Sequence, residues 1–213
     1  MKQVTTKRTI IKIIDDHLFS SLSAIPSKTN VAIAPPIIAK AKRNQKSMSV
    51  RFLVILCCSS EITGCGSGSI SVEAAIQIED SGHVHAVDYD PKAVELTKKN
   101  LAKFGISNIS VIGKNADEAI SELPEADTIF VGGTGKDTTG IVKMCLEKLK
   151  PGGRIVVEMI QIETIFSVLS FVQEQGLNSV DITQVTISKS RKTSTGTMML
   201  ARNPVTILSA TKN

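Results

Sequence analysis

Strand-like and helix-like hydrophobic patterns alternate along the chain from residue 52 onward. Short runs of Val, Ile and Leu predict strands, and longer segments with apolar residues three or four positions apart predict amphipathic helices. Strands are expected at 52–58, 83–88, 109–112, 128–131, 154–159, 179–187 and 197–208. Helices are expected at 70–79, 91–104, 116–123, 138–149 and 164–175. This repeated order predicts an α/β fold built on a mostly parallel, seven-stranded sheet.

Cap and turn residues agree with these boundaries. Asp90 precedes Pro91 at the expected start of a helix, where a capping carboxylate and a first-turn proline are favoured. Gly105 and Gly176 each follow a helix, where a left-handed residue commonly ends it. Because no long helix separates the last two predicted strands, they should pair as an antiparallel hairpin. Residues 151–153, Pro-Gly-Gly, predict a turn into the fifth strand.

The N-terminal segment differs in composition from the rest of the chain. Residues 1–51 hold ten of the 25 Lys and Arg and two of the 20 Asp and Glu, a net +8, which leaves −3 for the remainder. Residues 1–63 contain no glycine, whereas the other 150 contain all fourteen. We therefore divide the chain into an atypical basic segment at 1–51 and a catalytic domain at 52–213. Three interpretations of this segment are compatible with its composition: a helical extension, a disordered arm, or the product of a shifted reading frame.

Charge and cysteine usage narrow the class of protein. The mildly acidic catalytic domain argues against a nucleic-acid partner, and the apolar run at 52–58 is too short to span a bilayer. The four cysteines form no CxxC pair, and the adjacent Cys57 and Cys58 are poorly suited to a disulfide. The three histidines do not cluster at metal-ligand spacing. These features predict a cytoplasmic protein without a membrane partner or a metal.

A glycine-rich loop follows the first predicted strand and precedes the first helix. Such a loop lets a ligand approach the backbone beside free N–H groups of a helix N-terminus. The Lys and Ser or Thr of a nucleotide P-loop are absent, and Ser69 stands where a dinucleotide fingerprint has its third glycine. The spacing favours S-adenosylmethionine, although a structural turn or another nucleotide site has the same pattern. The predicted cofactor residues are Gly64, Cys65, Gly66, Ser67 and Gly68.

Asp88 is the best single candidate for a cofactor ligand. It ends the next predicted strand twenty residues after Gly68, where a carboxylate can accept hydrogen bonds from both ribose hydroxyls. The alternative is that Asp88 caps the following turn together with Asp90. Tyr89, the only tyrosine, would lie against the adenine or be an exposed loop residue.

Two further groups of residues suggest where a substrate binds. Gly132, Gly133 and Thr134 follow the fourth strand, at the carboxyl edge where ligands of open α/β sheets bind. The Asn/Asp-Pro-Pro-aromatic motif of amine-methylating enzymes is absent there, so these glycines indicate either room for a bulky substrate or a simple turn. Lys189 and Arg191, with Arg202 beyond them, are typical of a site for a polycarboxylate or of a solvated turn.

Seven segments together resemble the decarboxylating precorrin-6, or cobalt-precorrin-6B, C15-methyltransferase family of cobalamin biosynthesis. The resemblance covers residues 64–208, and the combination of VGGTG, GTMM and RNPV is its most specific part. The segments are GCGSGSISVEAA, HAVDYDPKAVELTKKNL, NADEAI, FVGGTG, LKPGGRIVV, GTMM and ARNPV.

The resemblance implies a Rossmann-like methyltransferase that uses S-adenosyl-L-methionine. It implies methylation of cobalt-precorrin-6B at C15 with loss of carbon dioxide from the C12 acetate chain, giving cobalt-precorrin-7 in the anaerobic pathway. Asn115 and Ala116 would lie near the adenine, and Thr197 with Met198 would face the tetrapyrrole. It also implies a homo-oligomer, a homotetramer. No catalytic acid or base is implied.

The N-terminus departs from the family pattern. Family members have an acid two residues before the first loop glycine, where this chain has Ile62, and their N-terminal Pro-x-Thr-Lys segment is not recognisable. This motivates the hypothesis that residues 1 to about 60 derive from a shifted frame. Three other readings stay open: a methyltransferase acting on RNA or a small molecule, an inactive remnant, and an NAD-dependent oxidoreductase.

Overall fold

The computed structural model describes residues 50–56, 68–133 and 137–213, with the side chains described from residue 68 onward. The elements of the first half are β1 (Val50–Leu56), α2 (Ser69–Ile78), the 3-10 helix η1 (Glu79–Ser81), β2 (Gly82–Val87), α3 (Pro91–Phe104), β3 (Ile109–Ile112) and α4 (Ala116–Glu122). Those of the second half are β4 (Ala126–Gly132), α5 (Thr138–Lys148), β5 (Leu149–Met159), α6 (Ile162–Glu174), β6 (Asn178–Val185), β7 (Ser188–Lys192), β8 (Thr197–Ala201) and β9 (Val205–Thr211).

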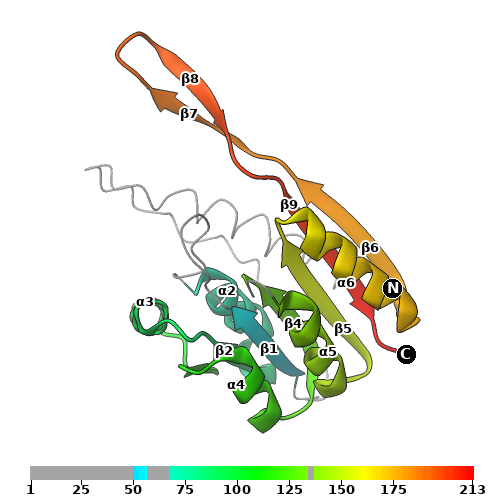
Figure 1. Cartoon of the computed structure of the whole chain (residues 1–213). Coiled ribbons are helices and arrows are strands. Elements are labelled where there is room, and N and C mark those ends of the chain that lie inside the picture. Colours follow the sequence, from blue (N-terminus) through cyan, green and yellow to red (C-terminus); the bar gives the residue numbers. More distant parts are fainter. Residues whose placement is uncertain (1–49, 57–67, 134–136) are drawn as a thin grey trace.

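Seven of these strands form one sheet in the order β3-β2-β1-β4-β5-β9-β6 (Figure 1). The pairs β1–β2, β2–β3, β1–β4 and β4–β5 are parallel, whereas β9 runs antiparallel to β5 and β6. The predicted α/β class is therefore confirmed. The strand order reverses direction between β1 and β4, which is the point where open α/β sheets bind their ligands. Because β1 begins at Val50, the boundary predicted after residue 51 falls inside this central strand.

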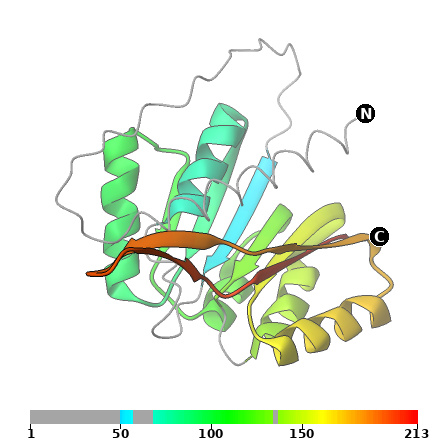
Figure 2. The ribbon, with the colours of Figure 1, turned by 90° about the horizontal axis from the view of Figure 1, so that it is seen from above.

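Two apolar layers cover the sheet, one on each face. On one face α4, α5 and α6 place Ile120, Val142 and Val168 against strand residues such as Ile129 and Ile155. On the other face the buried residues of α2 pack with five residues from four strands, and α3 lies beside α2 (Figure 2). That second cluster contains Ile70, Ala74, Ala75, Val84, Phe130, Val156, Val205 and Ile207. No helix in the described part of the chain is long and apolar enough to cross a membrane.

Helix α3 begins and ends as its sequence predicts. Asp90 accepts a hydrogen bond from Lys92 N at 3.0 Å, and Pro91 occupies the first turn, where its missing N–H has no intrahelical partner. Gly105 ends the helix with φ +65°, a conformation that costs a residue with a Cβ about 1–2 kcal/mol. The capped helix starts immediately after the carboxyl end of β2, so it fixes the position of the loop that carries Asp88.

The prediction of one continuous strand at 197–208 is wrong. The chain forms β8 and β9 instead, separated by three residues that include Pro204, whose missing N–H interrupts a hydrogen-bond ladder. All but the last residue of β9 are buried, whereas β8 is exposed except for Leu200. β8 pairs only with β7, which the sequence did not predict as a separate strand. These two strands form an extended hairpin, hereafter the arm.

Residues 151–153, where a turn was predicted, are part of β5, but the strand is irregular there: Gly152 has φ +73°, and the pairing with β4 shifts register between Ala126 and Thr128. The end of β9 pairs with this irregular segment: Gly152 N donates to Lys212 O and Lys212 N donates to Gly153 O, both at 2.9 Å. Lys212 Nζ also donates to the carbonyl oxygens of Leu146 and Leu149, which ties the start of β5 to the end of α5.

Candidate active site

Asp88 lies at the carboxyl end of β2, in the position expected for a ribose ligand. Its backbone N donates to Ile112 O at 3.0 Å, and the residue is 8% exposed. The carboxylate Oδ1 accepts a hydrogen bond from Asp90 N at 2.9 Å. Burial raises the pKa of Asp88, the Asp90 N–H lowers it, and the Asp90 charge raises it again. In the described part of the chain Oδ2 has no hydrogen-bond partner, so one oxygen is available to a ligand.

The start of α2 is shaped by Gly68, the last residue of the predicted glycine loop. Gly68 caps the helix with φ +65°, and a Cβ at this position would overlap the side chain of Thr97 in α3. Glycine therefore meets two requirements, a left-handed backbone and a close approach between α2 and α3. The other predicted loop residues, Gly64, Cys65, Gly66 and Ser67, lie outside the described residues.

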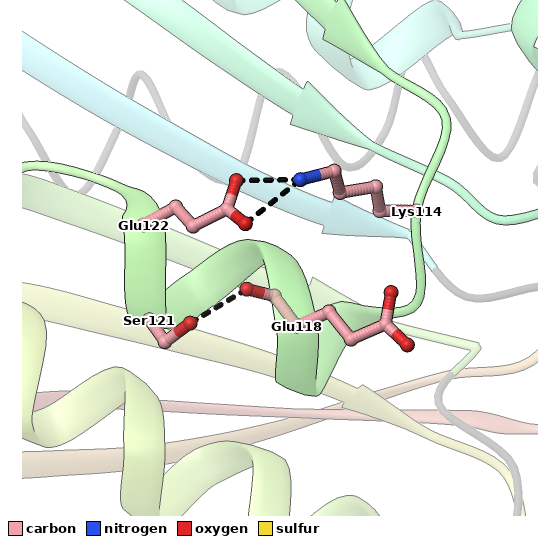
Figure 3. Close-up of polar contacts among 4 residues, drawn as sticks. All are labelled: Lys114, Glu118, Ser121 and Glu122. Atoms are coloured by element: carbon pink, nitrogen blue, oxygen red, sulfur yellow. Dashed lines mark hydrogen bonds and ion pairs between the residues drawn. The ribbon is translucent and has the colours of Figure 1, made fainter.

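The turn between β3 and α4 carries the two residues assigned to the adenine. Asn115 is exposed and stands before the first residue of α4 without a side-chain capping bond, and Ala116 is buried. Lys114 Nζ lies 2.6 Å and 2.8 Å from the two carboxylate oxygens of Glu122, on the next helix (Figure 3). Because both side chains are well exposed, this pair adds little to stability, but it connects the turn to α4. Tyr89 is 43% exposed.

The fourth strand ends at Gly132, and its neighbour on β5 is Glu158, an acid that was not predicted as a site residue from the sequence. A Cβ on Gly132 would lie 3.4 Å from Glu158 Oε2 and 3.2 Å from Phe130 Cε1. Glu158 is the penultimate residue of β5, and burial raises the pKa of its carboxyl. Gly133 follows with φ +63°, and Thr134 lies outside the described residues. The only signal in the sequence was a single acid within the apolar run Ile155–Met159.

The remaining predicted substrate residues lie on or next to the arm. Cross-strand pairing puts Lys189 opposite Leu200 and Arg191 opposite Met198, so these four side chains share one face. Thr197 pairs with Lys192 on the other face, and Arg202 N donates to Ile187 O at the base of the arm. The structure thus separates Thr197 from Met198, which the sequence had grouped together.

The arm extends above the carboxyl edge of the sheet, and from above it crosses over the body of the domain (Figures 1 and 2). Every residue of β7 is exposed. The structure therefore brings the predicted cationic residues to the side of the molecule where Asp88 and Gly132 lie.

A family model for the precorrin methyltransferase domain matches residues 62–212. The chain belongs to this family. The match includes the glycine-rich loop, every strand after β1 and the whole arm. The recognition made from the seven sequence segments is therefore confirmed, and so is the methyltransferase class of the fold.

Two named relatives match most of the chain. A probable cobalt-precorrin-6B C(15)-methyltransferase (decarboxylating) from Saccharolobus solfataricus is 35% identical over 206 residues, which cover 95% of this chain and 97% of that protein. A protein of the same description from Pyrobaculum calidifontis is 32% identical over 92% of this chain and 94% of its own length. At 95% coverage, the first alignment includes most of residues 1–51.

Solved structures of the family have the same fold. Precorrin 8W decarboxylase from Methanobacterium thermoautotrophicum superposes with a TM-score of 0.61 and is 33% identical, with 76% of this chain and 82% of that chain covered. Precorrin-6Y C5,15-methyltransferase from Geobacter metallireducens gives a TM-score of 0.64 at 26% identity, with coverage of 79% and 84%.

Proposed function

We propose that this protein methylates cobalt-precorrin-6B at C15 with S-adenosylmethionine and removes the C12 acetate carboxyl as carbon dioxide, giving cobalt-precorrin-7. The observation that carries the proposal is family membership over residues 62–212, together with relatives described by this reaction along almost their whole length. The carboxyl edge of the sheet supports it, because Asp88, which would bind the ribose, follows β2, and Gly132 ends β4, and these two strands lie on either side of β1 near the switch point.

The described part of the site fits the cofactor. Gly68 starts α2 with a left-handed backbone and lets the helix pack closely against Thr97 of α3. Within the described residues Asp88 Oδ2 has no hydrogen-bond partner, so this oxygen could accept from the ribose hydroxyls. Asn115 and Ala116 would line the adenine side, and Tyr89 would cover its ring. When bound, S-adenosylmethionine supplies an electrophilic methyl group to an electron-rich carbon, so the protein mainly aligns the two molecules.

The substrate would lie between the Gly132–Gly133 turn and the arm. A tetrapyrrole with several carboxylates has an apolar ring and an anionic rim. The arm face that combines Lys189 and Arg191 with Met198 and Leu200 matches both properties. Arg202, at the base of the arm, would contact another carboxylate. Gly132, at the carboxyl end of β4, would lie next to the ring.

We also propose that the chain forms a homo-oligomer, a tetramer, in the cytoplasm. An exposed hairpin that carries Met198 and Met199 is a costly surface to leave in water, and Ile162 and Phe166 of α6 are each 66% exposed. Light scattering coupled to size exclusion should give about four times the chain mass. Met198→Ser with Met199→Ser should lower the mass if the arm is part of the interface.

The decisive experiment is an assay of the full chain with enzymatically prepared cobalt-precorrin-6B. The mass of the product should rise by one methyl group and fall by one carbon dioxide, and both changes should require S-adenosylmethionine. Binding of S-adenosylhomocysteine is measured separately by calorimetry. Cofactor binding without turnover of this tetrapyrrole would overturn the substrate assignment, and no cofactor binding would support an inactive remnant.

A further inference from the structure

We propose that the Glu158 carboxyl donates the proton that replaces carbon dioxide on the C12 side chain. This inference rests on the proposed function. In the decarboxylation the bond between the side-chain CH2 and its carboxyl breaks, carbon dioxide leaves, and the electron pair passes into the conjugated ring. The pair then forms a new C–H bond with the proton of Glu158, and the methylated C15 loses its own proton to solvent, which leaves the conjugated ring uncharged. A methyl group remains on C12, and the Glu158 carboxylate regains its proton from solvent after product release.

The position of Glu158 fits this role. It lies at the carboxyl end of β5, between strands β4 and β9. Its register partner on β9 is Ile207, and on the other side its carboxyl approaches Gly132 of β4. Gly132 has no side chain, and so the carboxyl of Glu158 lies directly beside the turn that would receive the ring. The same face of the sheet carries Phe130 and Val156 below it, so the acid stands at the rim of an apolar layer.

The surroundings of Glu158 favour its neutral form. Within the described residues no hydrogen bond or ion pair reaches its carboxyl, and burial raises its pKa. A neutral acid can approach a substrate carboxylate without repulsion and has a proton to give, whereas an ionised one has neither property. Asp88 is a poorer donor because the Asp90 N–H bonds to its carboxylate and favours the ionised form.

Other acid groups in the described part of the chain are less well placed. His83 Nε2 lies 2.8 Å from Ser110 Oγ, near the start of β2 and therefore at the opposite edge of the sheet. Cys145 is fully buried in α5, where burial raises its pKa. Glu158 is thus the acid that combines a raised pKa with contact to the substrate turn.

The order of the two reactions follows from the chemistry. Attack of C15 on the methyl group leaves a positive charge in the conjugated ring, and this charge is the sink for the electrons released by decarboxylation. Methyl transfer should therefore come first and should not need Glu158. Loss of the acid should slow only the second step.

The test is Glu158→Gln in the full chain, because glutamine keeps the shape but has no proton to donate. Release of carbon dioxide should fall at least a hundredfold, the lower end of what a general acid contributes. A product that has gained a methyl group but kept its acetate should accumulate at nearly the parent rate. Glu163→Gln, an exposed acid-to-amide change on α6, is the matched control and should behave as the parent.

Three results would overturn the proposal: carbon dioxide release within threefold of the parent, equal loss of both reactions, or no activity in Glu158→Gln while Glu158→Asp restores none. Unchanged binding of S-adenosylhomocysteine shows that the variant is folded. If the parent itself neither methylates nor decarboxylates this substrate, the proposed function fails, and that result is distinct from a failure of the role of Glu158.

Discussion

Asp88, which is buried, and Glu158, which is partly buried, are acids at the same edge of one sheet, yet their surroundings differ. Burial raises the pKa of both carboxyls. Asp88 has a backbone N–H directed at one of its oxygens, and this bond maintains it as a hydrogen-bond acceptor. Glu158 has apolar neighbours and a glycine, which favour the protonated acid. Two carboxyl groups at one edge of the sheet are thus suited to opposite tasks, one to accept from the cofactor and one to donate to the substrate.

The largest expected difference between the two acids is in cofactor affinity. Asp88→Asn keeps the acceptor for Asp90 N but removes the charge that the ribose hydroxyls would meet. The loss should be about 2 kcal/mol, or about thirtyfold in Kd for S-adenosylhomocysteine. Calorimetric titration measures it, with Glu158→Gln as the control that should bind within about twofold of the parent. If both variants lost the same affinity for S-adenosylhomocysteine, the separate roles proposed for Asp88 and Glu158 would be contradicted.

Gly132 gives a second test of the difference between Asp88 and Glu158, because it lies beside Glu158. Gly132→Ala would place a methyl group 3.2 Å from Phe130 Cε1, so that ring must give by a few tenths of an ångström, and the same methyl group would come into van der Waals contact with Glu158 Oε2 at 3.4 Å. We expect decarboxylation to slow about tenfold, since small displacements of a catalytic group are costly. Product masses from single-turnover reactions give both steps. Cofactor affinity should not change, and a fall in that affinity would mean that Gly132 belongs to the cofactor half of the site.

A smaller effect is expected on the arm. Arg191→Ser removes one charged donor from the face that carries Met198, which should raise the KM for the tetrapyrrole about fivefold, equivalent to about 1 kcal/mol. Lys192→Ser removes the same charge from the opposite face of the same strand and is the matched control. Steady-state kinetics at fixed cofactor concentration separate KM from kcat. If both variants raise KM equally, the effect reflects net charge and not a binding face.

Features that depend on neighbouring residues in the sequence were predicted correctly, whereas features that depend on the pairing of distant strands were not. The cap at Asp90, the end of α3 at Gly105 and the position of Asp88 follow from residue types at fixed spacing, and the structure confirms their placement. Glu158 was missed because its importance comes from the β4–β5 register, which places it beside Gly132. The division between β8 and β9 was missed because Met198, Met199 and Leu200 look like core residues, although β8 lies on an exposed arm.

The smallest expected effect separates the ligand role of Asp88 from a capping role. Because its folded pKa is raised, the folded state binds this proton more tightly than the unfolded chain. The contribution of Asp88 to stability is therefore highest at low pH and is lost as the pH rises through the raised pKa. Asparagine has no such loss, so without cofactor Asp88→Asn should be at least as resistant to urea as the parent near pH 7.5, with a smaller advantage near pH 4. A variant that is clearly less stable at both pH values would mean that the charge holds the turn to Asp90, and a weaker cofactor affinity in Asp88→Asn would then reflect a damaged loop and not a lost ligand.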